Sequence, residues 1–145
     1  MADPLGIICS AQLYGRGLSL MTGDNPEIRR ADPSAEFFTD ERCHILETWN
    51  DARDPDVSVA RARVNPGVTT ELHVLDGIVE RYLVTQGTGE MELDGKPPVA
   101  VGPGDLVFIP AGVTQRVTNT GSADLIFYCI CTPAWREGVY RGLEG

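Results

Sequence analysis

Turn-forming residue pairs interrupt the chain at nearly even intervals, and this spacing limits what the chain can fold into more than any other feature. Pro66-Gly67, Asp94-Gly95, Pro103-Gly104 and Thr120-Gly121 are examples. The apolar runs between such turns are too short for long helices and suit strands of a half-buried sheet. About nine short strands at regular spacing are typical of a β-sandwich or β-barrel. We therefore expect an all-β fold.

The expected strands alternate in side-chain character along their length, as a sheet with one buried face requires. In the second of them, Ser58, Ala60, Ala62 and Val64 share one face, while Arg61 lies on the other. The nine strands are expected at residues 43–49, 57–64, 69–74, 78–85, 90–93, 99–101, 106–109, 115–118 and 125–131.

Length and charge narrow the function classes. The chain has 145 residues, enough for one domain with one core. Its formal net charge is -9, with scattered acidic residues and no basic patch, so nucleic-acid binding is not expected. No apolar run is long enough to span a membrane, and the residues 1–4 lack the cationic region of a signal peptide. We expect a cytoplasmic protein with a small-molecule ligand.

The chain divides into three expected parts. Residues 1–35 carry several Gly and Pro without a sustained period and are expected to form an extended N-terminal arm. Residues 36–135 are expected to form the barrel, and residues 136–145 a C-terminal tail. Trp135 and Tyr140, around the start of that tail, could cap the barrel or pack across a subunit contact.

The four cysteines are expected to be buried reduced thiols. Cys129 and Cys131 are two residues apart on a strand pattern, so their side chains point to the same face. A zinc pair is the alternative, but no second pair of ligands occurs at a matching spacing.

Two glycine-framed stretches carry the residues best suited to chemistry. In the first, five residues separate Gly67 from His73, and Glu80 is followed after six residues by Gly87. This pattern resembles the first motif of the cupin family, in which a glycine is followed by His-x-His, then a glutamate and then a glycine. Leu75 stands where that motif has its second histidine.

The second stretch has the framework of the second cupin motif. Five residues separate Gly104 from Pro110, and Gly112, Gln115 and Asn119 follow in register. Gln115 stands where the family usually has a third histidine. The resemblance covers roughly residues 57–131 and implies a small jelly-roll barrel, or double-stranded β-helix, with its site in the barrel mouth. It also implies a homodimer.

In the usual cupin site the motif histidines and glutamate bind a divalent metal. By resemblance, His73, Glu80 and Gln115 are the candidate ligands here, and an oxygen-rich set with one imidazole favours Zn, Mn or Ni. Glu71 lies two residues before His73 and could replace the missing histidine or act as a catalytic carboxylate. Tyr82 shares a strand face with Glu80 and is a candidate catalytic acid or hydrogen-bond donor.

Four arginines lie close to these stretches, at positions 61, 63, 81 and 116. One or two of them could hold an anionic substrate, but surface arginines that pair with the many carboxylates are the favoured interpretation.

Three functions fit this residue set. The first is a metal-dependent isomerase, lyase or dehydratase that acts on a small oxygenated, sugar-like or carbonyl substrate. The second is a non-catalytic cupin that binds or senses a small molecule, for which Leu75 is the best support. The third is a metal-free enzyme, similar to epimerase or cyclase relatives, that acts through His73 with Tyr82 or Glu80.

Overall fold

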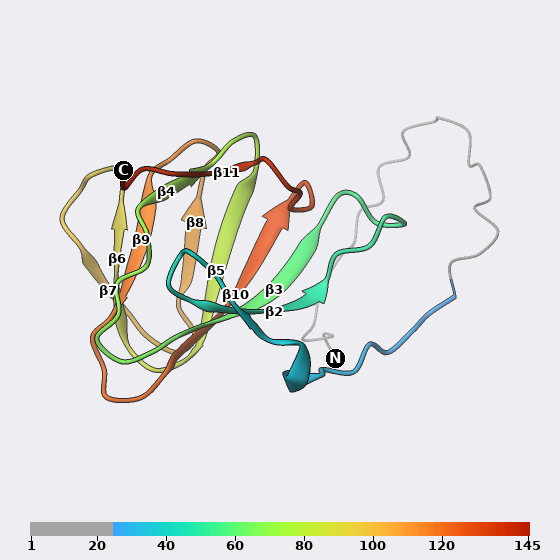
Figure 1. The fold of residues 1–145 in the computed structure, drawn as a ribbon, viewed down its shortest axis with the longest axis horizontal. Coiled ribbons are helices and arrows are strands. Elements are labelled where there is room, and N and C mark those ends of the chain that lie inside the picture. Colours follow the sequence, from blue (N-terminus) through green and yellow to red (C-terminus); the bar gives the residue numbers. More distant parts are fainter. Residues whose placement is uncertain (1–24) are drawn as a thin grey trace, which may run out of the picture.

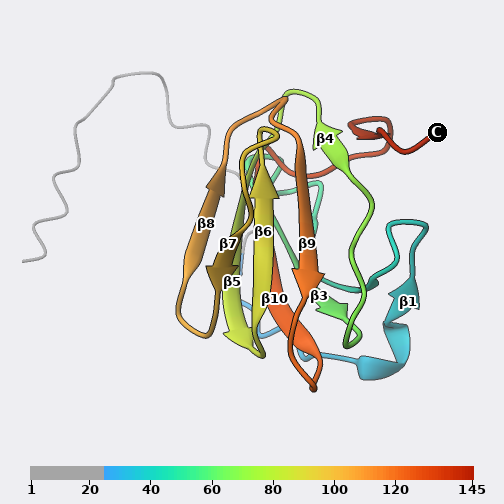
Figure 2. The same ribbon diagram turned by 90° about the vertical axis from the view of Figure 1, so that its left-hand side faces the viewer.

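In a computed structural model of the chain, described here for residues 25–145, two antiparallel β-sheets face each other and enclose the core. Figure 1 shows the two sheets side on, and Figure 2 shows them after a quarter turn. One 3-10 turn, η1 (Pro33–Ala35), is the single helical element of the described residues. The strands are β1 (Phe37–Phe38), β2 (His44–Trp49), β3 (Ser58–Val64), β4 (His73–Leu75), β5 (Val79–Gln86), β6 (Gly89–Leu93), β7 (Val99–Val101), β8 (Leu106–Ile109), β9 (Gln115–Asn119), β10 (Leu125–Thr132) and β11 (Tyr140–Gly142).

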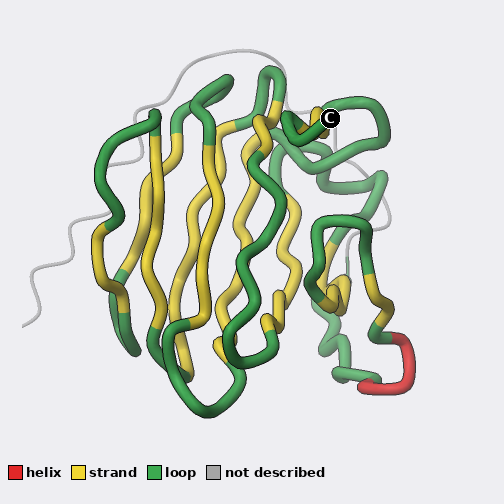
Figure 3. Tube along the Cα trace, turned by 60° about the vertical axis from the view of Figure 1, so that its left-hand side comes forward, coloured by secondary structure: helices red, strands yellow, loops and turns green. Residues whose placement is uncertain are grey.

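The strand order is that of a jelly roll. One sheet runs β1-β2-β3-β10-β5-β8 and the other runs β11-β4-β9-β6-β7. Strands that follow one another in the chain often lie in opposite sheets, so the connecting loops gather at the two ends of the barrel, as the tube in Figure 3 shows. This arrangement confirms the expected all-β jelly-roll barrel.

The predicted side-chain alternation is confirmed in the strands that carry the site. Ser58, Ala62 and Val64 of β3 are buried, and so are Glu80 and Tyr82 of β5. The main apolar core lies between the sheets and draws its buried residues from both of them. A second small cluster, which includes Leu75 and Cys131, lies close to the site.

Glycine is required where the first motif turns. Gly67 has a φ of 74° and Gly77 a φ of 73°, values that favour a residue without a side chain. Gly67 precedes the segment that leads into β4, and Gly77 lies in the turn between β4 and β5. These turns bring His73 and Glu80 to the same end of the barrel from different sheets.

The structure corrects the expected strands at three places. The strand expected at 69–74 is shorter and begins at His73, and Thr69 makes only an isolated bridge to Thr118. Two further strands, β1 and β11, were not predicted, because two or three residues give too little periodicity to recognise. The remaining predicted strands agree with the structure to within one residue at each end.

Of the expected N-terminal arm, residues 1–24 lie outside the described residues. Residues 25–35 form no strand and are exposed. No helix among residues 25–145 is long and apolar enough to cross a membrane.

Candidate functional site

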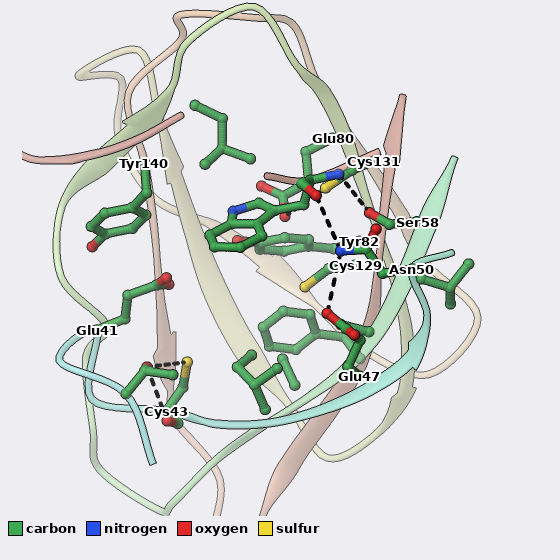
Figure 4. Close-up of a pocket in the computed structure, with 18 of the residues that line it drawn as sticks. Glu41, Cys43, Glu47, Asn50, Ser58, Glu80, Tyr82, Cys129, Cys131 and Tyr140 are labelled. Carbon is green, nitrogen blue, oxygen red and sulfur yellow. Dashed lines mark hydrogen bonds between the residues drawn. The ribbon is translucent and has the colours of Figure 1, made fainter. Parts of the chain in front are cut away.

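A cavity of about 350 Å³ opens between β2, β3, β5 and β10, with further walls from residues 37–41 and from the C-terminal segment. Figure 4 shows its lining, in which Glu41, Glu80 and Tyr82 point toward a common space and Tyr140 lies at one side. Two of the candidate residues from the motifs, His73 and Glu80, are part of this lining.

Glu80 is the most deeply buried carboxyl group of the cavity wall, with 6% of the residue exposed. Its Oε2 accepts a hydrogen bond of 2.8 Å from Nε2 of Gln115, which bridges from β9 of the opposite sheet. Its Oε1 lies 3.7 Å from the thiol of Cys131, which donates to it. Burial raises the pKa of Glu80 to about 7, although both of these donors oppose the rise.

His73 presents a neutral imidazole to the site. Its Nδ1 lies 2.9 Å from the backbone oxygen of Glu71. A carbonyl oxygen only accepts, so Nδ1 carries the proton and Nε2 keeps a free lone pair in the neutral ring. Burial lowers the pKa of His73, which favours this neutral form. The ring stacks on Tyr140 with the ring centres 4.8 Å apart.

Tyr140 reaches the cavity from β11, which pairs with β4. Its hydroxyl donates a 2.5 Å hydrogen bond to Oε2 of Glu71. Gly142 makes this arrangement possible, because a Cβ at that position would overlap the Glu71 carboxylate. The C-terminal strand therefore holds Glu71 and Tyr140 together, and Tyr140 in turn covers the imidazole of His73.

Glu41 adds a second half-buried carboxyl group that faces the cavity (Figure 4). It lies in the turn before β2, next to Arg42, whose φ is 68°. Arg42 is anchored by a 2.8 Å hydrogen bond from its Nε to the backbone oxygen of Thr69. Burial, together with the charges of Glu80 and Glu71, raises the pKa of Glu41 to about 7.

Tyr82 lies on the cavity wall and packs against Phe127, with ring centres 4.4 Å apart. Burial raises the pKa of its phenol well above the usual range, so the hydroxyl stays protonated and can donate a hydrogen bond. Cys43, Cys129 and Cys131 are free thiols that also line the cavity. This agrees with the prediction of reduced thiols for three of the four cysteines, and Cys9 lies outside the described residues.

The three predicted metal ligands are neighbours, because His73 pairs with Gln115 across β4 and β9 and Gln115 binds Glu80, but only His73 and Glu80 are of the usual ligand types. Among residues 25–145, no three His, Cys, Asp or Glu side chains converge in a group that could hold an ion. Gln115 does not line the cavity, and its amide nitrogen is committed to Glu80. Its Oε1 is buried and has no hydrogen-bond partner among the described residues. Gln115 is therefore placed to orient Glu80.

Of the two predicted catalytic residues, Tyr82 lines the cavity and Glu71 does not. Tyr82 lies at the cavity as expected. Glu71 is near His73 but precedes the strand and does not line the cavity, because its carboxylate turns to Tyr140. Two cavity residues that sequence reasoning did not select as functional are Glu41 and Tyr140. Neither belongs to a motif, and only the predicted capping position of Tyr140 gave a signal.

The four arginines near the motifs are half-buried, and three of them pair with carboxylates, as the favoured interpretation expected. Arg61 and Arg63 both bind Glu36, and Arg116 binds Glu92. Arg81 donates a 2.7 Å hydrogen bond to the hydroxyl of Thr132. None of them lines the cavity.

Comparison with known proteins agrees with this fold. The chain is 28% identical over 124 residues to the oxalate-binding protein of Thermotoga maritima. The alignment covers 86% of this chain and 91% of that protein. The crystal structure of a predicted oxalate decarboxylase from Thermotoga maritima superposes with a TM-score of 0.66 at 22% identity, covering 74% of this chain and 99% of that one.

A nucleoside dehydratase, Pac13 of Streptomyces, has the same barrel. It superposes with a TM-score of 0.66 at 18% identity and covers 81% of this chain and 92% of that one. The sequence model described as "Cupin domain" matches residues 60–131, which include both glycine-framed motifs. The chain is therefore a small member of the cupin family with a single cupin domain.

Proposed function

We propose that the protein is an enzyme of the isomerase, lyase or dehydratase kind that moves protons on a small oxygenated substrate in the barrel cavity. The observation that carries this proposal is the position of Glu80. Its carboxyl group is buried at the cavity wall and is held by the neutral donors Gln115 and Cys131, with no cation paired to it among the described residues. Such a group can give or take a proton near neutral pH.

His73 and Glu80 have complementary roles in a dehydration. The free lone pair on Nε2 of His73 takes a proton from a carbon next to the substrate carbonyl, and Glu80 in its acid form gives a proton to the leaving hydroxyl. A C–H and a C–O bond break, a C=C bond forms and water leaves. For an isomerisation, Glu80 returns its proton to carbon instead.

The two tyrosines and Glu71 complete the proposed site. Tyr82 stays protonated and donates a hydrogen bond to a substrate oxygen, as its position on the wall allows. Glu71 acts indirectly, because its carboxylate binds the hydroxyl of Tyr140 and its backbone oxygen fixes the tautomer of His73. It is a positioning residue in this proposal. The Pac13 dehydratase supports the reaction class only through its shared fold.

A metal-dependent form of the same reaction is the second candidate. Cupins often bind a metal, and the buried Oε1 of Gln115 has no donor in the described part of the chain. If that amide turned over, His73, Glu80 and Gln115 could hold Zn, Mn or Ni. No step of the proposed reaction is derived through such an ion, because the Gln115 amide nitrogen, and not its oxygen, faces Glu80.

The test is deuterium incorporation or water loss followed by NMR in D₂O, with a panel of hydroxy-carbonyl compounds, sugars and nucleosides. Turnover is expected to survive treatment with a chelator and to be lost in Glu80→Gln and His73→Gln. Glu90→Gln, a matched change at an exposed position of β6, should keep full turnover. Turnover that is lost on chelation and restored by one metal would establish the second candidate instead.

Absence of turnover across the panel, combined with thermal stabilisation by one of its members, would favour the non-catalytic binding function. A homodimer and a cytoplasmic location both stay predictions. Light scattering of the purified protein and fractionation of the source cells would test them.

A further inference from the structure

The charges around the cavity are unusual for a protein with an oxalate-binding relative. Four carboxyl side chains contribute to its lining, at Asp40, Glu41, Glu47 and Glu80. No lysine or arginine of residues 25–145 contributes to it. The one imidazole, of His73, has its Nδ1 2.9 Å from the backbone oxygen of Glu71 and its ring stacked on Tyr140. The cavity therefore offers negative charge and hydrogen-bond acceptors, but no cation.

Two guanidinium groups stack on the lining residue Trp49, and they do not change this balance. Arg29 and Arg53 lie over the ring of Trp49, with Cζ 4.5 Å and 5.8 Å from the ring centre. Both of them pair with Asp51 and Glu27, and neither lines the cavity. A dianion such as oxalate would enter without a charged partner, and an unpaired buried charge is costly.

Of the four cavity carboxylates, Glu41 is the best placed to interact with a charged ligand. Among residues 25–145 its side chain makes no hydrogen bond and no ion pair. By contrast, Glu47 accepts a 3.3 Å hydrogen bond from Asn50, and Glu80 is bound by Gln115. Glu41 also points into the cavity in Figure 4. A donor group on a ligand would give it the partner it lacks.

The walls between these carboxylates are aromatic. Trp49, Tyr82, Phe127, Trp135 and Tyr140 all contribute to the lining. Trp135 is held from two sides, because its backbone nitrogen donates to Ser58 at 2.9 Å and its backbone oxygen accepts from Asn50 at 3.1 Å. Flat rings and carboxylates together suit a planar ligand with donor groups, and aromatic faces also attract cations.

We propose that this cavity selects small planar ligands that are neutral or positively charged and rich in hydrogen-bond donors, that it rejects dicarboxylates such as oxalate, and that Glu41 sets this preference. The inference names the ligand class of the proposed active site and so rests on that proposal. It does not require turnover, because it concerns binding alone.

Three probes of nearly equal size and shape but different charge test it, namely benzamidine, benzamide and benzoate, with oxalate as a fourth. Dissociation constants are measured by calorimetry or NMR on the full chain after chelator treatment at pH 8. Benzamidine is expected to bind in the millimolar range or tighter, with benzoate at least about tenfold weaker, which corresponds to about 1.4 kcal/mol. Oxalate should not bind measurably.

Glu41→Gln keeps the size of the side chain and removes its charge. The ratio of benzamidine to benzoate affinity should fall at least about fivefold in this variant, while benzamide, which reports on an intact cavity, keeps its affinity to within about twofold. Glu90→Gln should leave all the affinities unchanged. Lack of benzamidine binding, binding of benzoate or oxalate as tight as that of benzamide, or an unchanged ratio in Glu41→Gln would each overturn the inference.

These results are separable from the proposed reaction. If the charge preference fails while turnover is still lost in Glu80→Gln, the ligand class is wrong and the proton-transfer function stands. If the charge preference holds and no turnover is found, the cavity is a selective binding site.

Discussion

The buried carboxyl group of Glu80 should make the protein less stable as the pH rises, and replacing it should remove this loss. The pKa of Glu80 is raised from its ordinary value of 4.5 to about 7 by burial. Its protonated form therefore contributes stability that is fully present below pH 4.5 and is lost as the pH rises through about 7. Each pH unit in that window is worth about 1.4 kcal/mol, so this one group accounts for a loss of about 3 kcal/mol.

Glu80→Gln is the perturbation that isolates this effect. A glutamine at position 80 can still accept the hydrogen bond from Gln115, but it never ionises. At pH 5 the variant should match the natural protein to within about 1 kcal/mol, because both side chains are then neutral. At pH 8 the variant should be more stable by about 3 kcal/mol, although the same change is expected to abolish turnover.

The cysteines near Glu80 act alike in both proteins and cancel in the comparison, whereas Glu41 does not. Cys131 and Cys129 on β10 have raised pKa values and stay neutral at pH 8, and Glu41 titrates in the same range as Glu80. The charge of Glu80 raises the pKa of Glu41, so Glu80→Gln also removes this repulsion, and about 3 kcal/mol is a lower estimate of the difference at pH 8.

The assay is urea unfolding at pH 5, 6, 7 and 8 in the presence of a chelator, followed by the fluorescence of Trp49 and Trp135. Glu90→Gln is the matched control, because it makes the same chemical change at an exposed position of β6. A constant difference between Glu80→Gln and the natural protein across this range would refute the reasoning, since the folded-state pKa of Glu80 would then be ordinary.

Three further changes test other parts of the site and its frame. Asn119→Ala should cost about 3 kcal/mol in urea unfolding, because the buried amide donates to two backbone oxygens and accepts from a third group; a cost below about 1 kcal/mol would contradict this. Gly142→Ala should lower the melting temperature and weaken benzamide binding, since the added Cβ displaces the Glu71 carboxylate from Tyr140, and crystallography should show that bond broken. Arg116→Ala should change the free energy of unfolding by less than about 1 kcal/mol, because its ion pair is partly exposed; a larger loss would show that this pair matters to the fold.

Most of the fold could be predicted from the sequence because its turns are marked by residue type. Gly67 and Gly104 have φ values of 74° and 93°, so these glycines lie in turns, as their spacing in the sequence predicted. The inward faces of β3 and β5 followed from strict alternation. The segment before β4 was less predictable, because Thr69 to Leu72 has a strand-like composition but makes scattered backbone hydrogen bonds to several segments instead of a continuous ladder.

The site was only half predictable, and the reason is physical. His73 and Glu80 lie in motifs whose spacing fixes where they end up. Glu41 reaches the cavity because Arg42 adopts a positive φ and is anchored to Thr69, far away in the sequence. Tyr140 reaches it because β11 pairs with β4. Neither position is marked by a periodic pattern in the sequence, so neither could be predicted from it.

These two additions change what the degenerate motif implies. With Leu75 in place of a histidine and Gln115 turned to Glu80, the motif residues alone leave one imidazole and one buried carboxyl group at the cavity. Glu41 supplies a second carboxyl group from outside the motifs, so the site gains negative charge at the same place where the family pattern would predict a metal cation. Burial raises the pKa of Glu41, the charges of Glu80 and Glu71 add to the rise, and no lysine or arginine of the described residues lines the cavity to attract an anion. The ligand's own charge therefore separates the two candidate functions: a donor-rich neutral or cationic ligand fits the metal-free site, whereas oxalate would need the metal.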